Sequence, residues 1–191
     1  MNMKKITIVG VGALGSHVAL LLRNVADLHV IDFDRIEQKN VSSQFHGKTN
    51  VGKLKAPSFQ QTMSFLFGTK IQATPHKLTK DNKLQLLAGS DLLLDCLDNG
   101  EARRIVQSFA RSTGTPCLHG ALAADGGFGR VIWDENFEID EAATGGATCE
   151  DGAHLPFIAV VASLLAKAAQ DFLLTEVKRG FQVHPGGVFS V

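Results

Sequence analysis

The chain has 191 residues, of which 45% are hydrophobic and 20% are charged, as is usual for one soluble globular domain. Lys and Arg together number 19, as do Asp and Glu, so the net charge is zero and we expect neither nucleic-acid nor membrane binding. The three cysteines form no CxxC pair, which indicates neither a zinc site nor a disulfide framework and favours reduced thiols in a cytoplasmic protein.

The first elements read as a βαβ unit. A β-branched strand over residues 5–10 is followed by a glycine-rich turn over 10–15 and a helix over 16–25. A second strand over 28–34 ends in acidic residues. Residues 37–50 read as irregular.

Helices and strands then alternate to the end of the chain. We expect a helix over 52–66 that Pro57 disturbs in its first half, and a short helix over 79–87 capped by Thr79. The remaining expected elements are strands over 70–78, 91–98 and 116–122, a helix over 99–112, an antiparallel strand over 128–133, a flexible acidic loop over 134–152, a long apolar helix over 155–174 and an edge strand over 181–191. No apolar run is expected to be long enough to cross a membrane.

This order of elements predicts one domain over residues 1–191. Its fold class is α/β: a doubly wound, Rossmann-like, mainly parallel sheet with helices on both faces and an antiparallel C-terminal extension.

The glycine-rich turn has the pattern Gly10-x-Gly12-x-x-Gly15 between a strand and a helix. The first glycine permits the tight turn, the second lets the backbone approach a phosphate, and the third lets the helix pack closely on the strand. Asp32 ends the second strand, where a carboxylate accepts hydrogen bonds from ribose hydroxyls, although a strand-end cap is the simpler alternative. At this point an NAD-dependent dehydrogenase and an ATP-using enzyme fit equally well.

Three later segments separate these alternatives. Asp32-Phe33-Asp34 leads into Asn40-Val41-Ser42-Ser43-Gln44; Gly52-Lys53-Leu54-Lys55 follows; and Asp95, Asp98, Asn99 and Arg103 are spaced as D-x-x-D-N-x-x-x-R. In this order the chain closely resembles the E1-like adenylating family of the ThiF, MoeB and HesA type. That family includes the enzymes that activate sulfur carriers for thiamine and molybdenum-cofactor synthesis. The resemblance spans roughly residues 5–174.

The resemblance implies a site for ATP and Mg²⁺. Lys55, with Asn40, would contact the phosphates, Asp98 would hold Mg²⁺, and Lys55 and Asp98 would act in catalysis. Without the family pattern, Lys55 would read as a surface lysine and Asp98 as a strand-end acid. The nucleotide-site residues implied are Gly10, Gly12, Gly15, Asp32, Asp34, Asn40, Ser43, Lys55 and Asn99. Arg103 would be a positioning or structural residue.

The chain also departs from the family pattern. Ser43 stands where the family has a phosphate-binding arginine, a change that would cost several kcal/mol of transition-state stabilisation, and Ala13 replaces a common glycine. No zinc is expected, and the helix that precedes the first strand in many relatives is expected to be absent. The chain therefore looks most like the short, zinc-free sulfur-carrier branch. The cations that could compensate for the missing arginine are Arg23, Arg35, Lys39, Lys48 and Lys53.

Cys149 precedes the long helix, where some family members carry a cysteine for acyl transfer or persulfide chemistry. A helix N-terminus lowers a thiol pKa, whereas Glu150 and Asp151 oppose this, so Cys149 is either catalytic or an incidental loop thiol. Cys96 and Cys117 lie in predicted strands and read as core residues. His119, near a strand end, and His184, before Pro185, are weaker candidates for the site.

The implied activity is that of an ATP-dependent adenylyltransferase. The C-terminal glycine carboxylate of a small ubiquitin-like or sulfur-carrier protein ending in Gly-Gly would attack the α-phosphate, giving an acyl-adenylate and pyrophosphate. The loop over 134–152 would receive the carrier's tail, and a homodimer is possible. The alternatives are an NAD(P)-dependent oxidoreductase, which leaves Asn40 and Lys55 unexplained, and a non-catalytic nucleotide-binding scaffold, which Ser43 supports.

Overall fold

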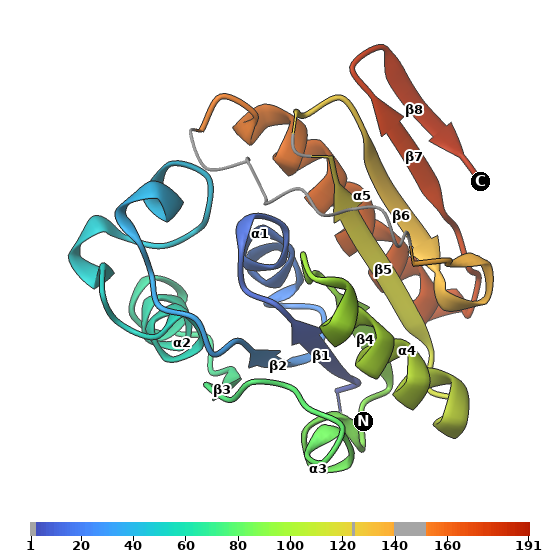
Figure 1. Ribbon diagram of the computed structural model, residues 1–191, viewed down its shortest axis with the longest axis horizontal. Helices are drawn as coiled ribbons and strands as arrows, with labels where there is room; N and C mark the ends of the chain where they lie inside the picture. Colours follow the sequence, from blue (N-terminus) through green and yellow to red (C-terminus); the bar gives the residue numbers. More distant parts are fainter. Residues whose placement is uncertain (1–2, 124, 140–151) are drawn as a thin grey trace.

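The computed structural model describes residues 3–123, 125–139 and 152–191, and its strands form one eight-stranded sheet (Figure 1). The strand order is β3-β2-β1-β4-β5-β6-β7-β8. The parallel part contains β1 (Lys5–Val9), β2 (Asp27–Ile31), β3 (Gln72–Thr74), β4 (Leu92–Asp95) and β5 (Cys117–Leu122). The antiparallel extension contains β6 (Gly129–Trp133), β7 (Phe181–His184) and β8 (Gly187–Ser190). The predicted fold class is confirmed.

Helices cover both faces of this sheet (Figure 1). One apolar cluster joins alternate strand residues such as Leu92 and Leu94 to α1 (Ala13–Leu22), α2 (Lys55–Phe67) and α5 (Leu155–Thr175). The second cluster joins Leu93 on the opposite face to α3 (Lys83–Leu87) and α4 (Gly100–Thr113). Because successive strand side chains point to opposite faces, a run of leucines in β4 fills both cores.

Helix α5 packs against α1 and against β5 and β6. By length and composition it is long and apolar enough to cross a membrane, so the expectation that no such run exists was wrong on that measure. Its buried face, which includes Val161, Leu165 and Ala169, belongs to the larger apolar cluster. The structure therefore uses α5 as a core helix.

Several element boundaries differ from the prediction. Pro57 does not disturb its helix, because α2 begins at Lys55 and Pro57 lies in the first turn, where a backbone N–H has no intrahelical partner. Thr79 does not cap α3: the N-cap is Asn82, which exchanges hydrogen bonds with Thr79 just before the helix. The last segment forms the hairpin β7–β8 rather than a single edge strand.

The segment expected to be a flexible loop over 134–152 begins as ordered structure. Its first residues form the 3-10 helix η3 (Asp134–Asn136), and both Asp134 and Phe137 are buried. Residues 140–151, which include Cys149, lie outside the described residues, so the predicted role of Cys149 stays a prediction.

Candidate functional site

The glycine-rich turn connects β1 to α1 at the carboxyl edge of the parallel strands. Gly10 has a φ of +93°, and a Cβ there would lie 2.8 Å from the carbonyl oxygen of Cys96. A Cβ on Gly15 would lie 1.9 Å from the carbonyl oxygen of Gly10. Both positions therefore need glycine, the first for its backbone conformation and the second because α1 packs directly on the turn.

Gly12, the N-cap residue of α1, has a different environment. A Cβ on Gly12 would meet only the Gln44 side-chain nitrogen, at 4.0 Å, so space remains beside this part of the backbone. The nearby segment also carries two buried polar atoms without a hydrogen-bond partner, Ser43 Oγ and Gln44 Oε1. Buried polar atoms are normally satisfied, and the Ser43 hydroxyl can donate to a phosphate oxygen, so this hydroxyl and the open space beside a helix N-terminus fit a bound phosphate group, whereas Gln44 Oε1 can only accept a hydrogen bond.

Asp32 follows β2 and is 8% exposed. One carboxylate oxygen accepts the Val11 N–H at 2.7 Å and the other accepts the Asp34 N–H at 2.8 Å. Burial raises the pKa of Asp32, while the Lys55 charge and these two backbone hydrogen bonds oppose that rise. Asp32 thus holds the glycine turn in place, and each oxygen keeps a free lone pair for a hydroxyl donor.

Lys55 meets Asp34 because two segments after β2 run antiparallel. Arg35 and Leu54 form an isolated β-bridge, and the Lys55 N–H donates to the Asp34 carbonyl oxygen at 2.8 Å. The Lys55 Nζ then lies 3.4 Å from Asp34 Oδ2. Lys55 is only 7% exposed, which is unusual for a lysine and excludes the surface-lysine interpretation.

A short segment over residues 43–46 lies across the start of α1. Ser16 Oγ accepts the Phe45 N–H at 2.9 Å, and His17 Nε2 lies 3.0 Å from the Ser43 carbonyl oxygen. His46 Nε2 donates to the Val11 carbonyl oxygen at 2.9 Å, and burial lowers the pKa of His46 to about 4. The sequence analysis missed these anchoring residues, because their partners lie about thirty residues away in the chain.

Asn40 lies in the 3-10 helix η1 (Gln38–Ser42) and is 3% exposed. Its Oδ1 accepts the Glu37 N–H at 2.9 Å as part of a capping box. Asn40 thereby shapes the chain that leads into residues 43–46. Its predicted contact with phosphate stays a prediction.

Asp98 and Asn99 lie at the carboxyl end of the neighbouring strand, between β4 and α4. Asn99 is the N-cap of α4, and its Oδ1 accepts the Ala102 N–H at 2.8 Å. Asp98 is exposed, and its carboxylate has no hydrogen-bond or ion-pair partner in the described part of the chain. The residues described contain no group of three His, Cys, Asp or Glu that could hold a metal. Mg²⁺ commonly needs only one or two carboxylates, together with water and substrate phosphates, so Asp98 fits that ion.

The other candidate residues have structural surroundings. Cys96 and Cys117 are free thiols among the described residues, and burial raises the pKa of each, which makes them poor nucleophiles. His184 lies on β7, where its ring packs near Phe128 and Phe189. Of the cations considered as replacements for the missing arginine, Arg23 packs over Phe67, next to the C-terminus of α1 rather than the glycine turn.

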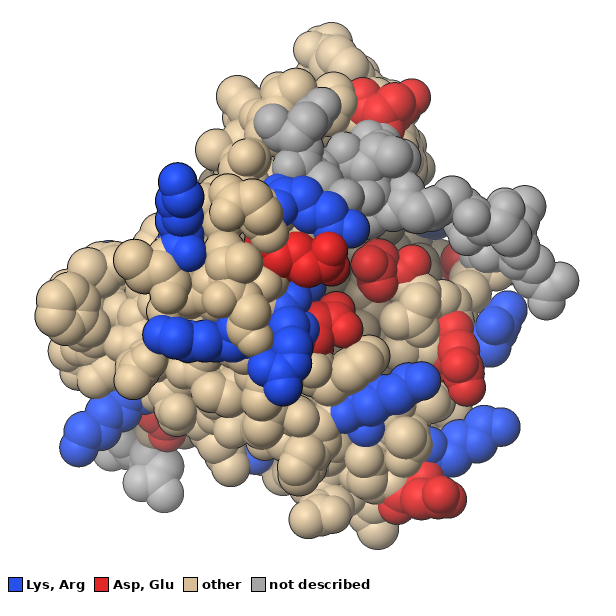
Figure 2. Space-filling view, turned by 60° about the vertical axis from the view of Figure 1, so that its left-hand side comes forward, with Lys and Arg blue, Asp and Glu red and all other residues tan. Residues whose placement is uncertain are grey.

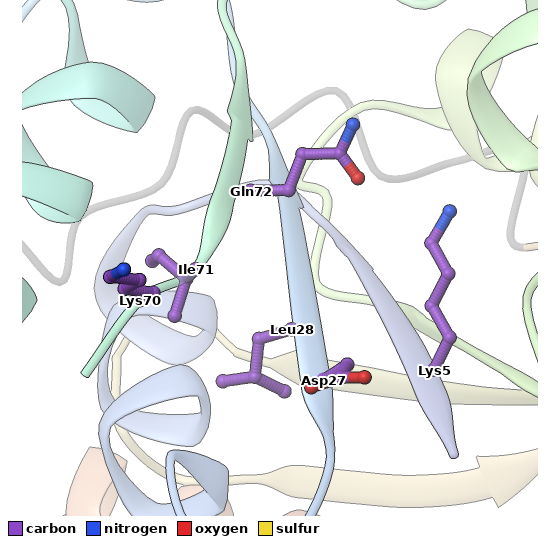
Figure 3. A pocket seen from close by; sticks show the side chains of 6 residues that line it. All are labelled: Lys5, Asp27, Leu28, Lys70, Ile71 and Gln72. Atoms are coloured by element: carbon purple, nitrogen blue, oxygen red, sulfur yellow. The ribbon is translucent and has the colours of Figure 1, made fainter. Parts of the chain in front are cut away.

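Figure 2 shows that one face of the molecule carries charge of both signs, with Lys and Arg side chains next to Asp and Glu side chains. A hollow of about 420 Å³ lies at the amino-terminal edge of the parallel strands (Figure 3). It contains no predicted site residue and is lined by Lys5, Asp27, Leu28, Lys70, Ile71 and Gln72. In open α/β sheets, ligands bind at the carboxyl edge, so the hollow in Figure 3 is not the candidate site.

Comparison with known proteins finds similar sequences and folds. The sequence profile described as the ThiF family matches residues 1–184. A sulfur carrier protein adenylyltransferase of Thermus thermophilus is 32% identical over 121 residues, covering 61% of this chain and 45% of that protein. The probable adenylyltransferase/sulfurtransferase MoeZ of Mycobacterium tuberculosis is 29% identical over 136 residues, covering 69% of this chain and 34% of that protein. The chain spans less than half the length of these curated relatives.

Solved structures share the fold at low sequence identity. The structure of E. coli MccB with ATP superimposes with a TM-score of 0.81 at 15% identity, covering 98% of this chain and 62% of that chain. The structure of PaaA gives a TM-score of 0.77 at 16% identity, with the same coverage. At this identity the similarity shows the fold alone.

Proposed function

This chain belongs to the ThiF family, and we propose from that membership that it is an ATP-dependent adenylyltransferase. Its acceptor would be the C-terminal glycine carboxylate of a small ubiquitin-like or sulfur-carrier protein ending in Gly-Gly. The products would be an acyl-adenylate and pyrophosphate. The observation that carries the proposal is the gathering of a buried lysine, two carboxylates and an open glycine turn at one edge of the sheet.

The reaction needs charge neutralisation more than proton transfer. A terminal carboxylate is already ionised near neutral pH, so the barrier includes the repulsion between this anion and the phosphates of ATP. Lys55 supplies a positive charge in a buried position, where electrostatic interactions are stronger than in water. The N–H groups at the start of α1 add a second source of positive potential beside Gly12.

The other site residues would bind the ribose, the phosphates and the metal ion. Asp32 would accept hydrogen bonds from the ribose hydroxyls, and Asp34 would hold the Lys55 ammonium. Ser43 would offer its orphaned hydroxyl to a phosphate oxygen in place of the family's arginine. Asp98 would hold Mg²⁺ with Asn99 beside it, and when bound this ion neutralises phosphate charge.

The proposal also covers the location, oligomeric state and pathway of the protein. The protein would act in the cytoplasm without zinc, as a monomer or homodimer, and thiamine synthesis is one pathway that uses such activation. As a catalytic residue, the Cys149 thiolate would attack the acyl-adenylate, forming a thioester with the carrier as the acyl–phosphate bond breaks and AMP leaves. A thiol-trapped carrier conjugate that disappears in Cys149→Ser would support that step.

Calorimetric titration with Mg·ATP, and separately with NADH, tests the proposal. We expect Mg²⁺-dependent ATP binding that weakens at least about tenfold in Asp98→Ala, with no NADH binding. Pyrophosphate exchange that requires a carrier ending in Gly-Gly would then establish the reaction. NADH binding that ignores Asp98 would refute the proposal and favour an oxidoreductase. ATP binding without exchange for any carrier would favour the scaffold.

A further inference from the structure

A series of buried ionic contacts runs behind the Asp98 loop, from α4 through β4 and β5 to η3. Arg103 Nη1 donates to Asp95 Oδ2 at 3.1 Å, and the same oxygen lies 2.7 Å from His119 Nδ1. The other ring nitrogen, His119 Nε2, lies 3.0 Å from Asp134 Oδ1. Asp95 and His119 are fully buried, and Arg103 and Asp134 are 9% and 7% exposed.

This geometry fits a His119 that carries both ring protons. Ionised carboxylates only accept hydrogen bonds, so each ring nitrogen must donate for both contacts to be favourable. A neutral imidazole could donate to only one carboxylate and would place a lone pair against the other. An imidazolium satisfies both contacts.

Charge balance among the buried groups alone is consistent with the same protonation state. The buried members of the series are the cations Arg103 and His119 and the anions Asp95 and Asp134, so they are neutral together when His119 is protonated. Burial alone opposes this state, as it lowers the pKa of His29 to about 4. For His119 the hydrogen bonds and charges of the two carboxylates overcome burial, and its pKa is raised.

The other titratable groups around the ring are two thiols and Arg111, whose half-exposed guanidinium adds a positive charge that solvent screens. Cys117 Sγ lies 3.6 Å from His119 Nε2, and burial raises the pKa of Cys117 and of neighbouring Cys96, so both stay neutral thiols. Arg111 Nε donates to the second oxygen of Asp134 at 2.8 Å, and its side chain is half exposed to solvent. Phe137 stacks on the ring with centroids 4.0 Å apart.

One end of this series shapes the loop that carries Asp98. Asp95 Oδ1 accepts the Leu97 N–H at 2.9 Å, and Arg103 Nη2 donates to the Leu97 carbonyl oxygen. Arg103 Nη2 also donates to the Gly120 carbonyl oxygen at 2.8 Å. The backbone immediately before Asp98 is therefore set by two side chains that His119 holds in place.

The other end holds the segment over residues 134–139. Arg111 and Gln107 both donate to the Phe137 carbonyl oxygen, at 3.3 and 3.2 Å. The same segment then passes the N-terminus of α4, where a Cβ on Gly100 would lie 3.7 Å from Ile139 Cγ2. This segment therefore reaches Gly100, which follows Asp98 and Asn99 in the chain.

We infer that His119 is a positioning residue: as an imidazolium it ties the 96–99 loop, which carries Asp98, to the 134–139 segment. This inference rests on the proposed function, because Asp98 is the residue whose position would matter for Mg·ATP. His119 itself touches neither nucleotide nor metal and acts through Asp95 and Asp134.

The protonation state is tested without any nucleotide. Long-range ¹H–¹⁵N correlation spectra of the wild-type protein, recorded at increasing pH, should show that His119 keeps both nitrogens protonated to a higher pH than a free histidine. His29 and His46 serve as internal controls and should appear neutral throughout the range above pH 6.5. Loss of the second His119 proton at or below pH 6.5 would overturn the inference.

The positioning role is tested by hydrogen exchange and by binding. In His119→Phe, which keeps the ring stack on Phe137, amides 97–99 should exchange about tenfold faster than in the wild type. The Kd for Mg·ATP should rise about tenfold, as for other residues that act through a metal ligand's surroundings. His29→Phe is the matched control, since that buried histidine faces Thr74 and lies outside the series. Unchanged exchange at 97–99 in His119→Phe would overturn the inference.

Asp134→Asn provides a second variant, should His119→Phe fail to fold. An asparagine can donate to a neutral Nε2 and still accept from Arg111, so it removes the need for an imidazolium. In the wild type the Kd for Mg·ATP should rise about tenfold as the pH is raised through the folded pKa of His119, whereas Asp134→Asn should show a flatter profile. If the Kd of the wild type and that of Asp134→Asn change with pH in the same way, the inference that His119 acts as an imidazolium is refuted.

The two proposals fail in different ways. If the wild type does not bind Mg·ATP at all, the proposed function is refuted, while the spectra and the exchange of amides 97–99 still decide the role of His119. If the wild type binds Mg·ATP but His119→Phe matches it in exchange and affinity, only the positioning role is refuted.

Discussion

Gly15 packs so closely on Gly10 that a Cβ on Gly15 would lie 1.9 Å from the Gly10 carbonyl oxygen. The start of α1 and the turn therefore have no room for a side chain between them. By contrast, a Cβ on Gly12 would meet only one side-chain atom, at 4.0 Å. Gly10 and Gly15 are therefore needed for folding, whereas Gly12 leaves open space beside the backbone of the turn.

This difference predicts opposite phenotypes for two matched substitutions. Gly15→Ala should lower the free energy of unfolding by about 1–3 kcal/mol, because the backbone must shift to admit a methyl group. Gly12→Ala should retain wild-type stability but weaken Mg·ATP binding, because the methyl group occupies the space beside the backbone. Urea denaturation and calorimetry measure both effects, and equal stability losses in the two variants would contradict the assignment.

Lys55 should matter for activity more than for folding. Removing its charge in Lys55→Gln leaves Asp34, which is partly exposed, without its cation, so we expect a small stability loss. Carrier-dependent pyrophosphate exchange should fall by about 100-fold or more, as when a charge-stabilising donor is removed from other active sites. Lys167→Gln, which removes an exposed lysine paired with Asp171 on α5, is the control and should keep full activity.

The two aspartates that flank the loop after β4 should also differ. Asp98 is exposed and its carboxylate makes no hydrogen bond or ion pair within the described residues, so Asp98→Asn should change the free energy of unfolding by less than about 0.5 kcal/mol while Mg²⁺-dependent binding is lost. Asp95 is fully buried between Arg103 and His119. Asp95→Asn should cost about 3–5 kcal/mol, because it leaves buried cations without an anion. Equal stability of the two variants would argue against the buried ionic series.

Stability should fall in acid because of His46. Its pKa is about 4 in the folded protein and near 6.5 when unfolded, so between these values only the unfolded chain binds the proton. The contribution of His46 to the free energy of unfolding is therefore present above pH 6.5. It is lost as the pH falls toward 4, by at most about 1.4 kcal/mol per pH unit. His46→Gln should flatten this slope in urea unfolding measured from pH 7 to about pH 4.5, with His76→Gln, in an exposed stretch, as the control.

The effect of His119 on the pH dependence of stability should be opposite to that of His46. Its pKa is raised in the folded protein above the ordinary value of 6.5, so its stabilising contribution is complete below pH 6.5 and is lost as the pH rises through the folded pKa. Wild-type stability should therefore decline in alkali more steeply than that of Asp134→Asn. Identical alkaline slopes in urea unfolding would contradict a charged His119.

The sequence by itself determined the fold class and the residues to examine. The pattern of buried strands, the glycine spacing and the acids at strand ends depend on neighbours a few positions apart, so they can be read along the chain. Motif order then indicated the family. The prediction from sequence was wrong about the start of α3. Thr79 was expected to be the N-cap, but the N-cap is Asn82 and the helix begins after it.

Only the tertiary structure decided which of these residues meet. Lys55 faces Asp34 because two segments after β2 pair antiparallel, and Ser43 is buried because residues 43–46 lie across α1. His119 lies against Asp95 because the parallel register of β4 and β5 pairs these two residues directly. Such contacts join residues tens of positions apart, and no local periodicity encodes them, because they depend on how the sheet aligns its strands.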